Sequence, residues 1–153
     1  MICIDEANLV SIKEHGQKAY PEECCGILLG NSSPEGMRNV TELRPLVNQN
    51  QQSRRNRFLI QAEDMVAAEK YAREKGLQIL GFYHSHPDVE ARPSQFDLEH
   101  AWPWYQYIIV SIKQGYPDSL SAWELQEDRT RFKSVEISLS SNAACAAKEN
   151  EHA

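Results

Sequence analysis

The sequence contains no hydrophobic run close to the roughly 20 residues that a helix needs to cross a bilayer. Its first residues, Met1 to Asp5, also lack the basic segment followed by a long apolar one that marks a secretory signal. These two absences predict a cytoplasmic protein that has no membrane as a partner.

Basic residues are fewer than acidic residues. The 153 residues include 16 Lys plus Arg against 22 Asp plus Glu, which gives a formal net charge of −6 with neutral histidines. Proteins that bind nucleic acid attract its phosphates with clustered Lys and Arg, so we expect no nucleic-acid partner. The densest basic cluster, Arg54, Arg55 and Arg57, lies in and next to the polar stretch 48–56, which predicts a surface loop.

Cysteine is scarce, and no Cys-x-x-Cys pair occurs among Cys3, Cys24, Cys25 and Cys145. A disulfide framework and a four-thiolate zinc site are therefore both unexpected. Cys24 and Cys25 are neighbours in an apolar segment, which favours buried structural thiols over nucleophiles.

Hydrophobic residues make up 41% of the chain and charged residues 25%, enough to build a core and to exclude disorder of the whole chain. The length fits one domain, and no internal repeat is visible. From about residue 140 the sequence consists of Ala, Ser, Asn and charged residues. We therefore predict a domain over 1–139 and a disordered tail over 140–153.

The hydrophobic pattern alternates between helical and strand-like segments, which points to a layered α/β domain. The expected helices cover 5–20, 62–75 and 94–101, and Gly76 stands where the second of them should end. The expected strands cover 25–30, 37–47, 57–60, 77–83, 107–112, 120–125 and 132–139.

Two histidines at the end of a predicted strand are the first candidates for chemistry. His84 and His86 are two residues apart, so their side chains leave the same face of the strand about 6.6 Å apart along the backbone. Two imidazoles placed in this way can converge on one cation, and a zinc site that keeps a water needs a third protein ligand. Asp97 is the natural candidate, because the loop 87–93 can turn the next helix back over the strand end.

Ser94 and Asp97 are three residues apart, so they share one face at the start of that helix. A hydroxyl beside a Lewis-acidic ion can donate to the oxyanion that forms when a carbonyl is attacked. Ser94 is also a good N-cap, and Asp97 stands where an acid favours the helix dipole. The capping and catalytic interpretations are compatible.

These residues belong to a longer pattern. The chain reads Glu23-Cys24-Cys25-Gly26, then His84-Ser85-His86-Pro87, and after six residues Ser94-Gln95-Phe96-Asp97. It resembles the JAMM, or MPN-plus, metalloproteases, in which an acid precedes a Cys-Gly strand and His-x-His-Pro is followed after six residues by Ser-x-x-Asp. The order of elements extends the resemblance over roughly 5–138.

The resemblance implies an α/β (α+β) fold with three αβα layers around a mixed, curved β-sheet, the cytidine-deaminase-like JAB/MPN fold. It implies that His84, His86 and Asp97 bind Zn²⁺, that Glu23 is the general acid/base, and that Ser94 stabilises the tetrahedral intermediate. The implied substrate is a ubiquitin-like or sulfur-carrier protein, cleaved at the peptide or isopeptide bond after its Gly-Gly tail. Because no insertion rich in Cys and His follows Asp97, a compact prokaryotic-type member is expected.

Several alternatives stay open at the level of sequence. Strand alternation does not separate Glu22 from Glu23, and His84 and His86 as an isolated pair could be hydrogen-bonded strand-end histidines. The chain could also be a metal-free MPN-type binding or scaffold module, or a zinc peptidase that acts on small peptides. The cluster of Arg54, Arg55 and Arg57 fits a solvated loop better than a contact for an extended substrate tail.

Overall fold

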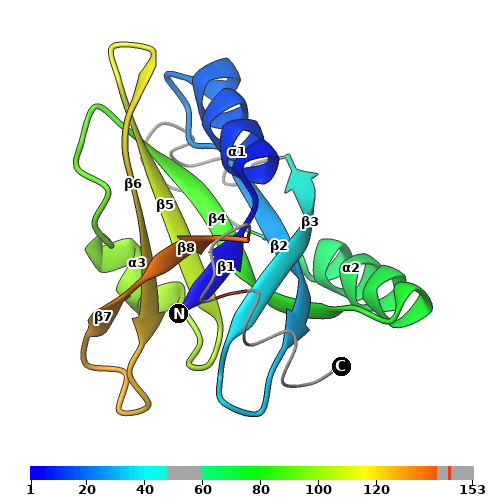
Figure 1. The fold of residues 1–153 in the computed structure, drawn as a ribbon. Coiled ribbons are helices and arrows are strands. Elements are labelled where there is room, and N and C mark those ends of the chain that lie inside the picture. The colour runs from blue at the N-terminus through cyan, green and yellow to red at the C-terminus, as the bar shows by residue number, and fades with distance from the viewer. Residues whose placement is uncertain (48–59, 141–144, 146–153) are drawn as a thin grey trace.

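The computed structural model describes residues 1–47, 60–140 and 145. Eight strands form one mixed sheet in the order β7-β6-β5-β4-β2-β3-β1-β8 (Figure 1). The strands are β1 (Ile2–Ile4), β2 (Cys25–Ser32), β3 (Arg38–Leu46), β4 (Gln78–Pro87), β5 (Gln106–Lys113), β6 (Tyr116–Leu125), β7 (Phe132–Val135) and β8 (Ile137–Leu139). The helices are α1 (Glu6–Ala19), α2 (Ala62–Lys75) and α3 (Gln95–His100).

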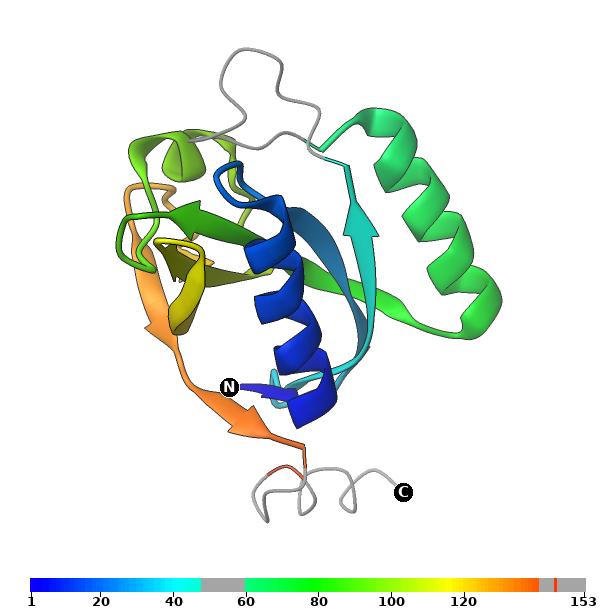
Figure 2. The same cartoon turned by 90° about the horizontal axis from the view of Figure 1, so that it is seen from above.

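Helices cover both faces of the sheet, which confirms the predicted layered, mixed architecture. Figure 2 shows α1 and α2 on opposite sides of β2 and β3. On the α1 side Ile12 packs in one hydrophobic cluster with Leu28 of β2. On the α2 side Ala68 and Ala72 pack in a second cluster with Ile27. Because consecutive strand residues point to opposite faces, one apolar strand fills both cores.

The helix boundaries follow local signals in the sequence. Asp5 caps α1, since its side chain accepts a hydrogen bond from the backbone N–H of Asn8 at 2.7 Å. Gly76 ends α2 with a left-handed φ of 68°, a conformation that glycine adopts without steric cost. Within the described residues no helix is both long enough and apolar enough to span a bilayer.

Strand β4 is longer than predicted. It continues through His84 and His86 to Pro87, because it pairs in parallel with β5 from Gly81↔Gln106 to Pro87↔Ile112. The predicted strand had ended at Tyr83, since the polar histidines interrupt its apolar run. The two histidines therefore stand on a hydrogen-bonded central strand, a more rigid base than a loop.

The prediction of one strand over 132–139 was wrong, because this segment forms two strands. β7 pairs antiparallel with β6, whereas β8 pairs in parallel with β1, and Glu136 alone separates them. Since β7 and β8 form the two edges of the sheet, this direct connection brings the edges together and curves the sheet towards closure (Figure 1). The short strand β1 was not predicted.

One part of the sequence prediction lies outside the described residues. The loop 48–56, the cluster of Arg54, Arg55 and Arg57 and most of the predicted strand 57–60 fall there, and Ile60 itself is not in a strand. The tail 140–153 is described only at Ser140 and Cys145. The boundary between domain and tail therefore stays a prediction.

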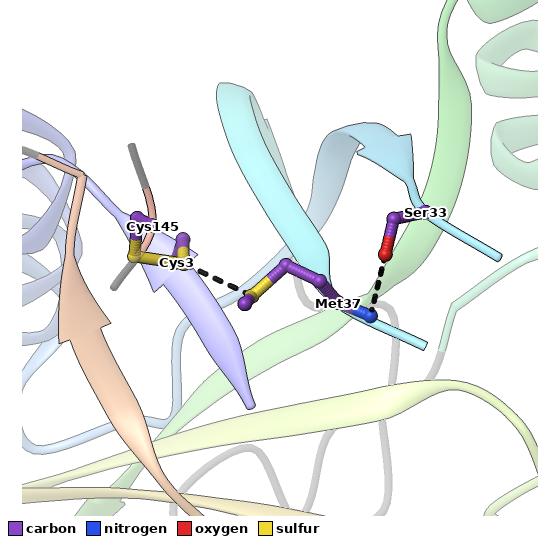
Figure 3. The surroundings of a disulfide bond; sticks show 4 residues. All are labelled: Cys3, Ser33, Met37 and Cys145. Carbon is purple, nitrogen blue, oxygen red and sulfur yellow. Dashed lines mark hydrogen bonds between the residues drawn. A yellow bond between two sulfur atoms is a disulfide. The ribbon is translucent and has the colours of Figure 1, made fainter. Parts of the chain in front are cut away.

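A disulfide corrects the expectation drawn from the cysteine pattern. Cys3 of β1 is bonded to Cys145, across a sequence separation of 142 residues. Figure 3 shows the pair beside Met37, whose Sδ lies 3.2 Å from Sγ of Cys3. The three side chains form a small buried cluster. Sequence spacing could not reveal the bond, because only the folded chain brings these two residues together.

Cys24 and Cys25 are buried thiols, as their apolar surroundings predicted. Burial is the main cause that raises the pKa of each to about 12. Both groups therefore stay protonated near neutral pH, which fits a structural role.

Reduction of the Cys3–Cys145 bond is expected to lower the free energy of unfolding by about 2 to 4 kcal/mol, because the bond closes a long loop in the unfolded chain. Denaturant titration with and without a reducing agent measures the effect, and Cys145→Ser should remove it.

Alkylation followed by mass spectrometry of protein taken directly from cells reports whether the bond forms there. Since such bonds are rare in a reducing cytoplasm, a fully bridged cysteine pair would contradict the predicted cytoplasmic location.

Candidate metal and catalytic site

The alternation of β4 places His84 and His86 on the face of the sheet that α2 and α3 cover. Phe82, two residues before His84, packs in the α2-side cluster, and the two histidines continue that row. Both side chains are buried, and their Nε2 atoms lie 3.1 Å apart. The structure therefore brings the two imidazoles together as their spacing predicted.

The cap of α3 holds Asp97 over the histidine pair. The Oγ of Ser94 accepts a hydrogen bond from the backbone N–H of Asp97 at 3.1 Å. In return, Oδ2 of Asp97 accepts one from the backbone N–H of Ser94 at 2.8 Å. This reciprocal capping box leaves the same Oδ2 atom 3.2 Å from Nε2 of His84 and 3.1 Å from Nε2 of His86.

The three atoms form a nearly equilateral triangle of the size that a small cation requires. Ligands held at about 2.0 to 2.1 Å in a tetrahedral zinc site are separated by about 3.3 Å, close to the three distances between His84, His86 and Asp97. In addition, Nδ1 of His86 lies 2.9 Å from the carbonyl oxygen of Glu90. A carbonyl only accepts hydrogen bonds, so Nδ1 carries the proton and Nε2 keeps its lone pair for a cation.

The charge states also suit a metal site. Burial lowers the pKa of His84 below its usual value, and the nearby Asp97 only partly opposes this effect. Burial alone would raise the pKa of Asp97. The charge and hydrogen bond of a protonated His84, together with the contact of His86 and the hydrogen bond from the backbone N–H of Ser94, outweigh burial and hold that pKa well below its usual range. A neutral imidazole and an ionised carboxylate are the forms that bind a divalent cation.

Glu23 lies beside this triangle, two residues before the start of β2. A carboxylate oxygen of Glu23 and a ring nitrogen from each of His84 and His86 all lie within 4.8 Å of one another. Glu23 is 2% exposed, whereas Glu22 is on the surface. The structure thus places Glu23, rather than Glu22, at the site.

The protonation of Glu23 is strongly perturbed. Burial, and secondarily the charge of Asp97, raise the pKa of Glu23 to about 9. In the metal-free protein this carboxyl group is therefore protonated at neutral pH. A bound cation would favour the carboxylate and lower its pKa, so Glu23 is a group that can exchange a proton near neutral pH.

An apolar cavity of about 790 Å³ adjoins His84 and Asp97. Its lining includes residues of α2 and of α3, and many aromatic rings. The principal apolar lining residues are Met65, Phe82, Phe96, Trp102, Tyr105, Tyr107 and Phe132. The place of these rings beside the histidines depends on contacts between distant elements and has no local signature in the sequence.

The raised pKa of Glu23 predicts that the free energy of unfolding of the metal-free protein falls as the pH rises. Since the folded pKa of about 9 lies above the unfolded value of about 4.3, the stability contributed by the protonated carboxyl is lost as pH rises between them. Glu23→Gln removes this titration. After treatment with a chelator, the free energy of unfolding of the variant should rise relative to that of the native chain by about 2 to 4 kcal/mol between pH 5 and 8.

Denaturant titration of both proteins across that pH range measures the difference. The titration of His84 is common to both proteins and cancels to first order in the comparison. Parallel pH profiles for the native chain and Glu23→Gln would show that Glu23 is not held in its protonated form by the fold.

Comparison with known proteins places these residues in context. A family model described as prokaryotic homologs of the JAB domain matches residues 5–126. A desampylase of Haloferax volcanii is 35% identical over 119 residues, which cover 76% of this chain and 79% of that protein. A CysO-cysteine peptidase of Mycobacterium tuberculosis is 23% identical over 138 residues, which cover 89% of this chain and 91% of that protein.

The fold is shared with a solved structure as well. A JAB1/MPN domain protein from Archaeoglobus fulgidus superposes with a TM-score of 0.54 at 22% identity. The match covers 91% of this chain and 96% of that one. At this level of identity the likeness concerns the fold, and it confirms the α/β (α+β) architecture with a curved sheet that the sequence motif implied.

Proposed function

Because the chain belongs to the family of prokaryotic homologues of the JAB domain, we propose that it is a zinc-dependent hydrolase. In this proposal it cleaves the peptide or isopeptide bond after the Gly-Gly C-terminus of a ubiquitin-like or sulfur-carrier protein. The observation that carries the proposal is the triangle of ligand atoms from His84, His86 and Asp97 beside the buried Glu23. The desampylase and CysO-cysteine peptidase relatives support hydrolysis of such carrier proteins.

His84, His86 and Asp97 would hold the Zn²⁺ ion. When bound, zinc supplies Lewis acidity and lowers the pKa of a coordinated water to about 7. The capping box of α3 fixes the carboxylate, and the carbonyl of Glu90 fixes the tautomer of His86. Both supports hold the ligand atoms in position before a cation arrives.

Glu23 would move the proton that amide hydrolysis requires. Its carboxylate takes a proton from the attacking water and then passes it to the departing amine nitrogen, so one group acts first as base and then as acid. The burial that raises its pKa keeps the transferred proton on Glu23 between the two steps.

Ser94 would stabilise the negative charge that develops on the carbonyl oxygen. Its Oγ accepts the N–H of Asp97, which leaves its own O–H proton available to donate. Ser94 is exposed at the start of α3, where an incoming carbonyl group can reach it. Donation of this kind stabilises the tetrahedral intermediate more than the planar substrate.

The direct test is a carrier protein fused through its Gly-Gly end to a reporter. The native chain should release the reporter, a chelator should stop the release, and added Zn²⁺ should restore it. A short peptide with the same last residues serves as a second substrate. Cleavage of the short peptide but not of the fusion would support the alternative of a zinc peptidase for small peptides, and cleavage of neither would contradict the proposed hydrolase.

A further inference from the structure

Ser85 stands between the two histidines but points to the opposite face of the sheet. It is completely buried. Its Oγ accepts a hydrogen bond from the backbone N–H of Cys24 at 2.8 Å, and its own backbone N–H donates to the carbonyl oxygen of Cys24 at 3.2 Å. Ser85 therefore binds both the backbone N–H and the backbone carbonyl of Cys24, the residue that follows Glu23.

The hydroxyl replaces a backbone partner at the point where the strand ladder ends. β2 pairs antiparallel with β4 from Gly30↔Gln78 to Cys25↔His84. One step further, the N–H of Cys24 bonds to the side chain of Ser85 in place of a strand carbonyl. The chain can therefore turn out of the sheet at Cys24 without leaving a buried N–H unsatisfied. Glu23 is the residue immediately before this turn.

Helix α1 packs against Ser85 on the face of the sheet opposite the two histidines. A Cβ atom added to Gly16 would lie 3.3 Å from Cβ of Ser85 and 3.0 Å from Cδ1 of Ile112. These distances are tighter than ordinary van der Waals contacts, so Gly16 lets the helix backbone pack closely on the strand. The side chain of Ser85 is therefore enclosed between α1 and β2, and its hydroxyl is held against the N–H of Cys24.

We propose that Ser85 is a positioning residue for the general acid/base, acting through the Cys24 amide to hold the Glu23 carboxylate beside the histidine pair. The inference rests on the proposed function of Glu23 and adds to it a residue that touches neither substrate nor metal. A displacement of a catalytic group by about 1 Å can cost about 10²-fold in rate. Loss of the hydroxyl should therefore lower kcat while substrate binding and zinc binding persist.

The test compares kinetics of the native chain, Ser85→Ala, Ser85→Thr and Ser85→Val on the Gly-Gly reporter fusion. Thr and Val have the same shape, so any packing cost of the added methyl group is common to both, and only Thr keeps a hydroxyl. We expect kcat to fall at least tenfold in Ala and in Val, with KM within about twofold and with zinc content unchanged. Thr should recover at least tenfold in kcat over Val.

Ser138→Ala is the control for loss of a buried serine hydroxyl. Ser138 is buried in β8, which β2, β3 and β1 separate from β4 in the sheet. Its kcat should equal that of the native chain. Equal kcat in Ser85→Thr and Ser85→Val would overturn the proposal that Ser85 positions Glu23. Loss of zinc together with activity in Ser85→Val would overturn it as well.

Crystal structures of the Thr and Val variants give a readout that does not depend on activity. The Glu23 carboxylate should keep its place in Ser85→Thr and shift in Ser85→Val, and an unchanged Glu23 in the Val variant would overturn the inference. If the native chain fails to cleave the fusion, the proposed function fails. The position of Glu23 in these structures still decides the role of Ser85.

Discussion

Replacement of Glu23 by glutamine is expected to lower kcat by about 10² to 10⁴-fold, the range that general acid/base groups contribute. The amide has nearly the size of the carboxyl group but cannot take up and return a proton. Glu23 is buried and lies against the histidine pair, and the Asp97 carboxylate beside it is already engaged by His84 and His86. Steady-state kinetics on the Gly-Gly reporter fusion, with zinc content measured in the same preparations, provide the measurement.

Glu22→Gln is the matched control for this experiment. It makes the same chemical change one residue earlier, at an exposed position. Its kcat should stay within about twofold of the native value, because exposed substitutions have small effects. Equal turnover by the native chain and Glu23→Gln would refute the role of Glu23 and leave the metal site untouched.

Asp97→Ala is expected to remove both the bound zinc and the activity. The native protein should contain close to one zinc ion per chain, since three protein ligands and an open position form a catalytic zinc site. Without Asp97 only His84 and His86 of the triangle remain. Metal analysis of purified native and variant protein, together with turnover, tests the expectation.

The substitution also breaks the capping box of α3, so a second variant is needed to separate the two effects. Asp97→Asn keeps a side-chain oxygen that can accept from the N–H of Ser94 but loses the negative charge. It should retain the helix cap and bind zinc much more weakly. Glu99→Gln, at an exposed position of the same helix, should keep the native zinc content.

The outcome also separates the enzyme from the metal-free alternative. Absence of zinc from native protein prepared without chelator, and failure to take it up on addition, would favour a metal-free binding or scaffold module of the same fold. Zinc retained in Asp97→Ala would instead indicate that Glu23 joins His84 and His86 as a ligand, an arrangement whose atoms also lie close together.

The local chemistry of the sequence determined much of this site. The spacing of His84 and His86 on a strand, and of Ser94 and Asp97 at a helix start, each follow from the periodicity of one element. The cap at Asp5 and the left-handed turn at Gly76 are equally local. Such features are readable because the interacting residues are near neighbours in the chain.

Only the tertiary structure decided which distant residues meet. The family resemblance already selected Glu23, but its burial beside the histidines, which Glu22 lacks, depends on the fold. The Cys3–Cys145 bond joins positions 142 residues apart. The division between β7 and β8 reflects two different pairing partners, and the hold of Ser85 on Cys24 spans 61 residues. Contacts of this kind follow from packing of the whole chain, because no property of either residue alone identifies its partner.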